Sequence, residues 1–236
     1  MTASLIPLPA YRSFEPGEML DRATSFREEL GRRRTVRDFS DRPVDLRIIE
    51  QCLLTAGSAP SGANLQPWRF VVITSRELKH RVREAAEAEE HEFYTRRAPQ
   101  EWKDALAPLG TDEHKSFLDK APVLIAIFER KHSHLPDGRR VTSYYVTQSV
   151  GIATGMLIAA VHHAGLASLT HTPSPMGFLT DLCGLDGDFR PFLLLVVGYP
   201  AADAKVPDIR RKPLDEIASF IAEGDDIAPA SERRSS

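Results

Sequence analysis

The sequence predicts a fold of the α/β or α+β class. Two observations support this prediction: short apolar runs rich in β-branched residues alternate with longer helical patterns, and no segment of the chain repeats. A length of 236 residues suits one large domain or two small ones, and it can bury a sizeable core without disulfide bonds.

Four segments have helical patterns. Residues 16–30 carry acidic side chains early and are followed by arginines, an order that suits the helix dipole. Residues 77–94 are highly charged, whereas residues 144–164 are almost entirely apolar, with small residues that let another helix or chain approach closely. Residues 44–56 have the spacing of a buried helical stripe, at Ile48, Ile49, Cys52 and Leu53.

Four other segments are predicted strands. Residues 68–74 are β-branched and aromatic, and residues 165–172 form a further short strand. Residues 122–128 and 192–198 are apolar on both faces, so we expect both to be buried and the first to lie at the centre of its sheet. Strands and helices alternate throughout.

The remaining segments have polar, loop-like compositions. Residues 99–120 are less regular than their neighbours, and residues 131–140 are a predicted loop. Asp, Pro, Ser and Arg dominate from residue 223 onward, which predicts disorder. We therefore expect an N-terminal arm over 1–16, a folded domain over 17–222 and a disordered tail over 223–236.

The composition excludes several classes of protein. With 30 basic and 33 acidic residues, the net charge of −3 argues against a nucleic-acid binder, which needs a basic face. No apolar run approaches the ~20 residues of a membrane helix. Cys52 and Cys183 stand far apart without metal-ligand spacing, so we expect reduced, buried thiols, no metal site and a cytoplasmic setting.

Two basic clusters and one small-residue loop are candidate binding features. Arg33, Arg34 and Arg37, with Thr35 between them, can grip a phosphate through forked hydrogen bonds, although composition alone favours a solvated basic patch. Residues 60–68 contain a glycine that lets backbone approach a ligand, and as a lone motif they fit an ordinary connector equally well. A second basic cluster lies at residues 210–212.

The chain lacks the common signatures of catalysis. It has no nucleophile elbow, no HExxH motif, and neither of the usual glycine-rich loops for dinucleotides or triphosphates. The adjacent His162 and His163 are more typical of a core or an interface than of metal ligands. If the protein is an enzyme, a bound organic cofactor must therefore supply the difficult chemistry.

Taken together and in order, the motifs resemble the FMN-dependent nitroreductase superfamily, and within it the iodotyrosine deiodinase (halotyrosine dehalogenase) branch. The resemblance spans residues 8–215 and rests on motifs at residues 33–37 (RRTVR), 59–68 (APSGANLQPW), 170–173 (THTP), 197–200 (VGYP) and 206–215 (VPDIRRKPLD). It implies an α+β, nitroreductase-like fold in which helices flank a central mixed, mainly antiparallel sheet. It also implies an intertwined homodimer.

The resemblance further implies that FMN binds at the homodimer interface. The family's phosphate and ribityl contacts match residues of both basic clusters, and its flavin-edge segment matches the THTP motif, where Thr172 would offer its hydroxyl to flavin N5 and so be the catalytic residue. The cofactor-binding residues implied in this way are Arg33, Arg34, Thr35, Val36, Arg37, Ser61, Thr170, His171, Thr172 and Arg211.

A second signature concerns the substrate. Glu90, Tyr94 and Lys115 match the residues with which an active-site lid, here residues 77–118, holds the zwitterion of a halotyrosine. Glu90 and Tyr94 are four residues apart and so share a helix face, and a carboxylate and a lysine can pair with the substrate's ammonium and carboxylate. Without the resemblance, a solvated acidic helix is the better reading. The backbone N–H of Ala63 would receive the substrate phenolate.

The resemblance thus implies FMN-dependent reductive dehalogenation of 3-iodo-, 3-bromo- or 3-chlorotyrosine to tyrosine and halide. Two alternatives stay open: an NAD(P)H-dependent nitroreductase or quinone reductase of broad aromatic specificity, and a flavin-binding protein without turnover. The electron donor would be a reductase or NAD(P)H. Animal members carry an N-terminal membrane anchor, whereas this chain begins close to the matching region, so we expect a cytoplasmic form with neither membrane nor nucleic-acid partners.

Overall fold

A computed structural model describes residues 5–8, 10–106, 108, 110–135 and 137–221. The predicted tail at 223–236 lies outside the described residues, as does part of the predicted N-terminal arm. The chain divides into two compact units, residues 1–206 and residues 207–236. Among the described residues, every strand belongs to the first unit, and the second unit has one short helix, α8 (Leu214–Ile217).

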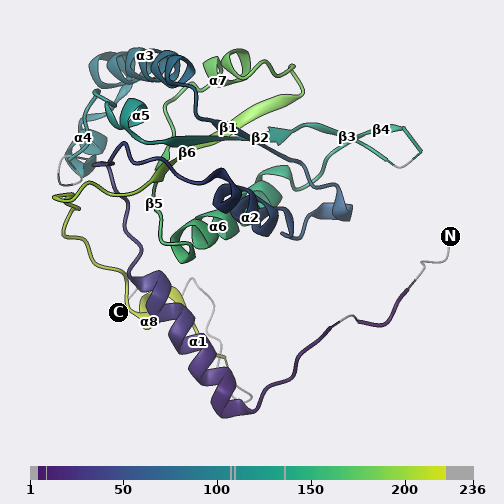
Figure 1. Ribbon diagram of the computed structural model, residues 1–236. Coiled ribbons are helices and arrows are strands. Elements are labelled where there is room, and N and C mark those ends of the chain that lie inside the picture. Colours follow the sequence, from purple (N-terminus) through teal and green to yellow (C-terminus); the bar gives the residue numbers. More distant parts are fainter. Residues whose placement is uncertain (1–4, 9, 107, 109, 136, 222–236) are drawn as a thin grey trace, which may run out of the picture. The chain divides into compact units, whose positions relative to one another are not determined.

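The first unit is built on a four-stranded sheet in the order β1-β2-β6-β5 (Figure 1). Its strands are β1 (Trp68–Ile73), β2 (Val123–Arg130), β6 (Phe189–Gly198) and β5 (Ala167–His171), and each neighbouring pair is antiparallel. The one parallel pairing among the described residues is an isolated bridge between Thr35 and Ser168. The predicted mixed, mainly antiparallel sheet is thus confirmed.

The two central strands are the ones that the sequence predicts as buried. Side chains alternate between the faces of β2, so that Leu124, Ala126 and Phe128 join one apolar cluster, while Val123, Ile125 and Ile127 join another. Because both faces are covered, the strand reads as one continuous apolar run. Burial on two sides explains why these strands could be identified from sequence.

Helices cover both faces of this sheet (Figure 1). On one face, α2 (Leu46–Gly57) and α6 (Val146–His163) supply Ile49, Cys52 and Leu157 to the core. On the other face lie α3 (Arg76–Glu92), α5 (Phe117–Lys120) and α7 (Phe178–Leu182), which contribute the side chains Val82, Ala86, Phe117, Leu118 and Leu179. Two apolar clusters thus hold three layers together.

The first helix, α1 (Pro16–Gly31), begins at a proline as predicted but has no buried residue. Its last turn is held by the consecutive histidines of α6. His162 Nε2 lies 2.8 Å from the carbonyl oxygen of Glu29, and His163 Nδ1 lies 2.7 Å from the Glu29 carboxylate. The two histidines therefore make a contact between helices.

Several short elements differ from the sequence prediction. The predicted loop at 131–140 is wrong, because β3 (His132–His134) and β4 (Arg140–Thr142) pair there as a hairpin. The irregular stretch 99–120 contains α4 (Gln100–Leu106) and α5. The charged helix ends at Glu92 and continues as a π-helical segment, η2 (Phe93–Arg97), and a 3-10 turn, η1 (Gly62–Asn64), precedes β1. Strands of three residues with at most one apolar side chain are too short to show a hydrophobic alternation that could reveal them.

No helix among the described residues combines the length and apolarity that a membrane span requires.

Gly198, at the end of β6, has less room for a Cβ atom than any other glycine among the described residues. A Cβ atom built there would lie 2.5 Å from Pro122 Cδ and 3.3 Å from Phe39 Cδ1, inside the buried core. We predict that Gly198→Ala lowers the free energy of unfolding by about 1–3 kcal/mol, because overpacking forces ring and backbone to shift. Urea denaturation measures this loss.

Gly57→Ala is the matched control, since a Cβ at Gly57 meets nothing within 4 Å. It should leave stability unchanged or raise it. Equal stability of the two variants would contradict the packing argument.

Candidate functional site

A cavity of about 510 Å³ lies where the end of β5 meets α3, η2, α4 and the start of α5. Its wall combines charged, aromatic and hydroxyl side chains from segments far apart in sequence. The lining residues are Arg37, Glu90, Phe93, Tyr94, Pro99, Leu106, Thr111, Lys115, Phe117, Leu169, Thr170, His171, Thr172 and Ser174.

The three predicted substrate-binding side chains meet in this cavity. Glu90 comes from α3, Tyr94 from η2, and Lys115 from the loop before α5. Lys115 Nζ lies 3.3 Å from Glu90 Oε2 and 5.9 Å from the centre of the Tyr94 ring. The side chains of Lys115 and Glu90 are only 3% and 14% exposed, so each charge helps to compensate the other, and Lys115 Nζ also donates to the carbonyl oxygen of Asp112.

Tyr94 is anchored as a hydrogen-bond donor. Its hydroxyl donates to the carbonyl oxygen of Thr111 at 3.4 Å. Burial and, to a lesser extent, the charge of Glu90 raise the pKa of Tyr94, which keeps the phenol protonated. The cavity therefore presents an anion, a cation and a phenolic donor within reach of one small ligand.

The THTP segment divides its side chains between two environments. Residues 170–172 all line the cavity, but Thr170 and Thr172 are exposed, whereas His171 is buried and packs edge-on against Phe117, with the ring centroids 5.7 Å apart. Burial, together with the charges of Lys115 and Arg37, lowers the pKa of His171 to about 3. The imidazole is therefore neutral, and its buried Nε2 has no hydrogen-bond partner among the described residues.

A second, smaller cavity of about 280 Å³ is lined by Arg33, Thr35, Gly155, Ile158, Ser168 and Thr170. The Thr35–Ser168 bridge and a hydrogen bond from Val36 N to the Ser168 carbonyl at 3.3 Å attach this basic segment to β5. Thr170 lines both cavities, and so joins them. A guanidinium and threonine hydroxyls are donors that suit a phosphate group.

The residues of the basic segment 33–37 differ in which cavity they line. Arg33 and Thr35 line the small cavity and Arg37 lines the large one, whereas Arg34 lines neither. The side chain of Val36 is buried in the core, so it could meet a cofactor only through its backbone. Alternation along an extended segment accounts for this pattern.

The small-residue loop lies elsewhere. Ser61 and Ala63 line neither cavity, because their loop precedes β1, at the sheet edge opposite β5. Three strand spacings, about 14 Å, separate the two edges. Ala63 adopts a left-handed φ of 49°, and the hydrogen bonds of the turn use the N–H groups of Asn64 and Leu65. Within one copy of the chain, this loop therefore does not reach the cavity that holds Glu90, Tyr94 and Lys115.

The remaining predicted contact, Arg211, belongs to the second unit, where its side chain is exposed. Conversely, the sequence prediction missed several residues at the large cavity. Thr111 accepts the Tyr94 hydroxyl and Phe117 packs on His171. Their proximity to Lys115 in sequence was the only signal that could have revealed them.

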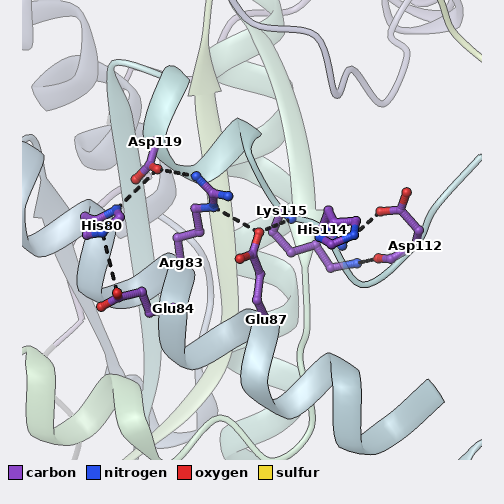
Figure 2. A network of polar contacts seen from close by, with 8 residues as sticks. All are labelled: His80, Arg83, Glu84, Glu87, Asp112, His114, Lys115 and Asp119. Carbon is purple, nitrogen blue, oxygen red and sulfur yellow. Dashed lines mark hydrogen bonds and ion pairs between the residues drawn. The ribbon is translucent and has the colours of Figure 1, made fainter. Parts of the chain in front are cut away.

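A further group of polar side chains supports Lys115 (Figure 2). The Lys115 N–H donates to Glu87 Oε1 at 2.6 Å, and Arg83 contacts both Glu87 and Asp119. Burial tends to raise the pKa of each carboxyl, but hydrogen bonds outweigh it and leave both pKa values below their usual range. The donors are Lys115 N–H and Arg83 for Glu87, and Arg83 and His80 for Asp119.

Comparison with known proteins identifies relatives over most of the chain. The profile of the Nitroreductase family matches residues 30–199. An iodotyrosine deiodinase from Haliscomenobacter hydrossis is 51% identical over 199 residues, which cover 84% of this chain and 90% of that protein. Iodotyrosine deiodinase 1 from Homo sapiens is 41% identical over 209 residues, covering 88% and 72%.

A solved structure shows the same relationship. The crystal structure of an oxidized iodotyrosine deiodinase bound to FMN and 3-iodo-L-tyrosine superimposes with a TM-score of 0.70 at 30% identity. The match covers 83% of this chain and all of that chain.

His171 should make the protein sensitive to acid. Because its folded-state pKa of about 3 lies below the ordinary 6.5, the unfolded chain binds more protons at intermediate pH, and stability falls as pH drops from 6.5 toward 3. We predict that His171→Gln removes up to about 1.4 kcal/mol per pH unit from this slope. Urea denaturation between pH 6.5 and 5 measures it.

His114→Gln, at an exposed histidine, is the control and should change the slope less than His171→Gln does. Parallel slopes for His171→Gln and wild type would refute the assignment.

Proposed function

The chain belongs to the nitroreductase family and, within it, to the iodotyrosine deiodinase branch, and on this premise we propose that it removes the halogen from 3-halotyrosines with the help of FMN. The observation that carries the proposal is the nearly buried Glu90–Lys115 pair beside Tyr94, in a cavity that adjoins a basic one. A nitroaromatic or quinone has no pair of opposite charges for such a clamp to recognise.

The residues present fit FMN. Arg33 and Thr35, in the small cavity, would hold its phosphate and ribityl chain, and Thr170 would continue the contacts into the large cavity. Gly155 leaves open space beside them, since a Cβ there meets nothing within 4 Å. The exposed Thr172 would offer its hydroxyl to flavin N5. The other proposed cofactor contacts are Arg34, Val36, Arg37, Ser61, His171 and Arg211.

Reduced FMN, when bound, supplies two electrons, so that a halotyrosine takes up these electrons and one proton and yields tyrosine and halide. The chain's own contribution is to hold the substrate. An amino acid carries an ammonium and a carboxylate a few ångströms apart. When it binds, its ammonium would pair with Glu90 and its carboxylate with Lys115, in place of the pair that these two side chains form with each other. Since the incoming charges compensate those that they separate, no charge is left buried and unpaired.

We also propose that the site is completed by a second copy of the chain. Ser61 and Ala63 are part of the proposed flavin and phenolate contacts but lie away from the clamp cavity of their own chain. A partner would supply them. The partner would pack on one face of α6, which carries Ile152, Met156, Ala159 and His163. The last three of these residues line a largely apolar cavity of about 570 Å³.

For the electron donor we propose only a class of molecule. NAD(P)H or a separate reductase would reduce the flavin, as in other flavin-dependent oxidoreductases of this family. A cytoplasmic location stays a prediction from the cysteine pattern, and Cys52 and Cys183 are both free thiols here.

The zwitterion clamp is tested by comparing two ligands. We expect wild type to bind 3-iodotyrosine much more tightly than 2-iodophenol, which has the ring but not the charges. Lys115→Ala should weaken iodotyrosine binding about tenfold or more, because a charge-assisted hydrogen bond contributes about 1.5–3 kcal/mol. Titration followed by flavin fluorescence measures both affinities.

Lys120→Ala, at an exposed lysine of α5, is the control and should change neither affinity. The clamp would be disproved by a Lys115→Ala variant that binds iodotyrosine as wild type does.

The dimer is tested by mass. Light scattering should give about twice the chain mass of 26.3 kDa. Ile152→Glu places a charge on the apolar face of α6 and should yield monomers that lose FMN, because a buried unpaired charge opposes association. A monomeric wild type that retains its flavin would contradict the proposal.

A further inference from the structure

One face of α3 carries four charged or polar side chains that all contact the segment 115–121. Lys79, Arg83, Glu87 and Glu90 are spaced by four, four and three residues, so they lie in one row along the helix. The row runs beside the buried Val82 and Ala86, where α3 packs on the core. The side chains in the row are therefore partly shielded from water.

The first half of this row holds the C-terminal end of the segment. Lys79 Nζ donates to the carbonyl oxygens of Asp119 and Ala121 at 3.0 and 2.7 Å, and thereby caps the last turn of α5. Arg83 Nη1 donates to Asp119 Oδ2 at 2.7 Å (Figure 2). These contacts set the position of α5 along α3.

The second half holds Lys115 at both of its ends. Glu87 accepts the Lys115 backbone N–H at 2.6 Å, while Glu90, three residues later, lies 3.3 Å from the ammonium group. Arg83 Nε donates to Glu87 at 2.9 Å, so that one guanidinium joins Glu87 to Asp119. Figure 2 shows Arg83 between the two carboxylates, with Lys115 beyond Glu87.

This arrangement matters because a lysine side chain is long and flexible. Fixing an ammonium group on four rotatable bonds costs side-chain entropy, and a mobile backbone would add its own entropy to that cost. Glu87 anchors that backbone through the Lys115 N–H, and Arg83 orients Glu87 through its own hydrogen bond at 2.9 Å. Neither side chain lines the cavity, so neither would touch the substrate.

We propose that Glu87 and Arg83 are positioning residues for substrate recognition. They hold the Lys115 backbone beside α3, so that the Lys115 ammonium lies next to Glu90 and faces the cavity. The proposal rests on the proposed function, because it concerns the same amino-acid clamp. It adds to that function a second row of charges whose effect reaches the substrate only through Lys115.

The experiment compares Glu87→Ala with Glu87→Gln in the FMN-loaded protein. Affinities for 3-iodotyrosine and 2-iodophenol are measured by flavin fluorescence. Glu87→Ala should weaken iodotyrosine binding about tenfold, the loss of one hydrogen bond to a charged group, and leave iodophenol within about twofold. Glu87→Gln keeps an acceptor oxygen and should retain most of the affinity.

Glu84→Ala provides the matched control. Glu84 lies one helical turn before Glu87, and its side chain pairs with His80, at 3.5 Å, and not with the segment 115–121, so its removal should change neither affinity. Hydrogen exchange of the segment around Lys115 gives a readout independent of ligand. Exchange should be faster in Glu87→Ala than in wild type, and unchanged in Glu84→Ala.

The failures are distinguishable. A wild type that prefers iodotyrosine, combined with a Glu87→Ala variant that keeps both this preference and slow exchange around Lys115, overturns the positioning role and leaves the proposed function intact. A wild type without that preference overturns both. Equal weakening of both ligands by Glu87→Ala also overturns the positioning role, since it indicates a general loss of structure.

Discussion

The ion pair between Glu90 and Lys115 is the constraint on which the site depends. Both side chains are almost fully removed from water, and a single buried charge without a partner would cost several kcal/mol. Apart from the Asp112 carbonyl oxygen, which accepts from Lys115, each charge is compensated by the other, and a ligand that separates them must bring two charges of its own. This condition favours a zwitterion over any ligand that carries only one charge.

The pair also explains the organisation of the surrounding segments. Two residues of the clamp come from α3 and its π-helical extension, and the third comes from the loop before α5. These segments meet because α3 presents apolar side chains to the sheet and a row of polar ones to residues 115–121. A helix with two differently specialised faces thus supports the core and the clamp at once.

Strand β5 connects the cavity that holds Glu90 and Lys115 to the smaller cavity that Arg33 and Thr35 line. Thr170 lines both cavities, and the Thr35–Ser168 bridge attaches the arginine-rich segment to the same strand. At this edge, His171 is buried while the threonines on either side are exposed. Simple alternation along one strand therefore separates side chains that stabilise the fold from side chains that are available to a cofactor.

The sequence by itself determined the central strands and the main helices, because burial on both faces leaves a continuous apolar run, as in β2, and burial on one face leaves a helical stripe, as in α2. Its resemblance to a family predicted the trio Glu90, Tyr94 and Lys115, and the structure brings these three side chains to one cavity. The tertiary structure alone decided that residues 132–142 form a hairpin, that Glu87 holds Lys115, and that Ser61 and Ala63 lie away from the cavity of their own chain. Such features depend on which distant segments become neighbours: Glu87 and Lys115 are 28 residues apart, and nothing in the local pattern of either records that contact.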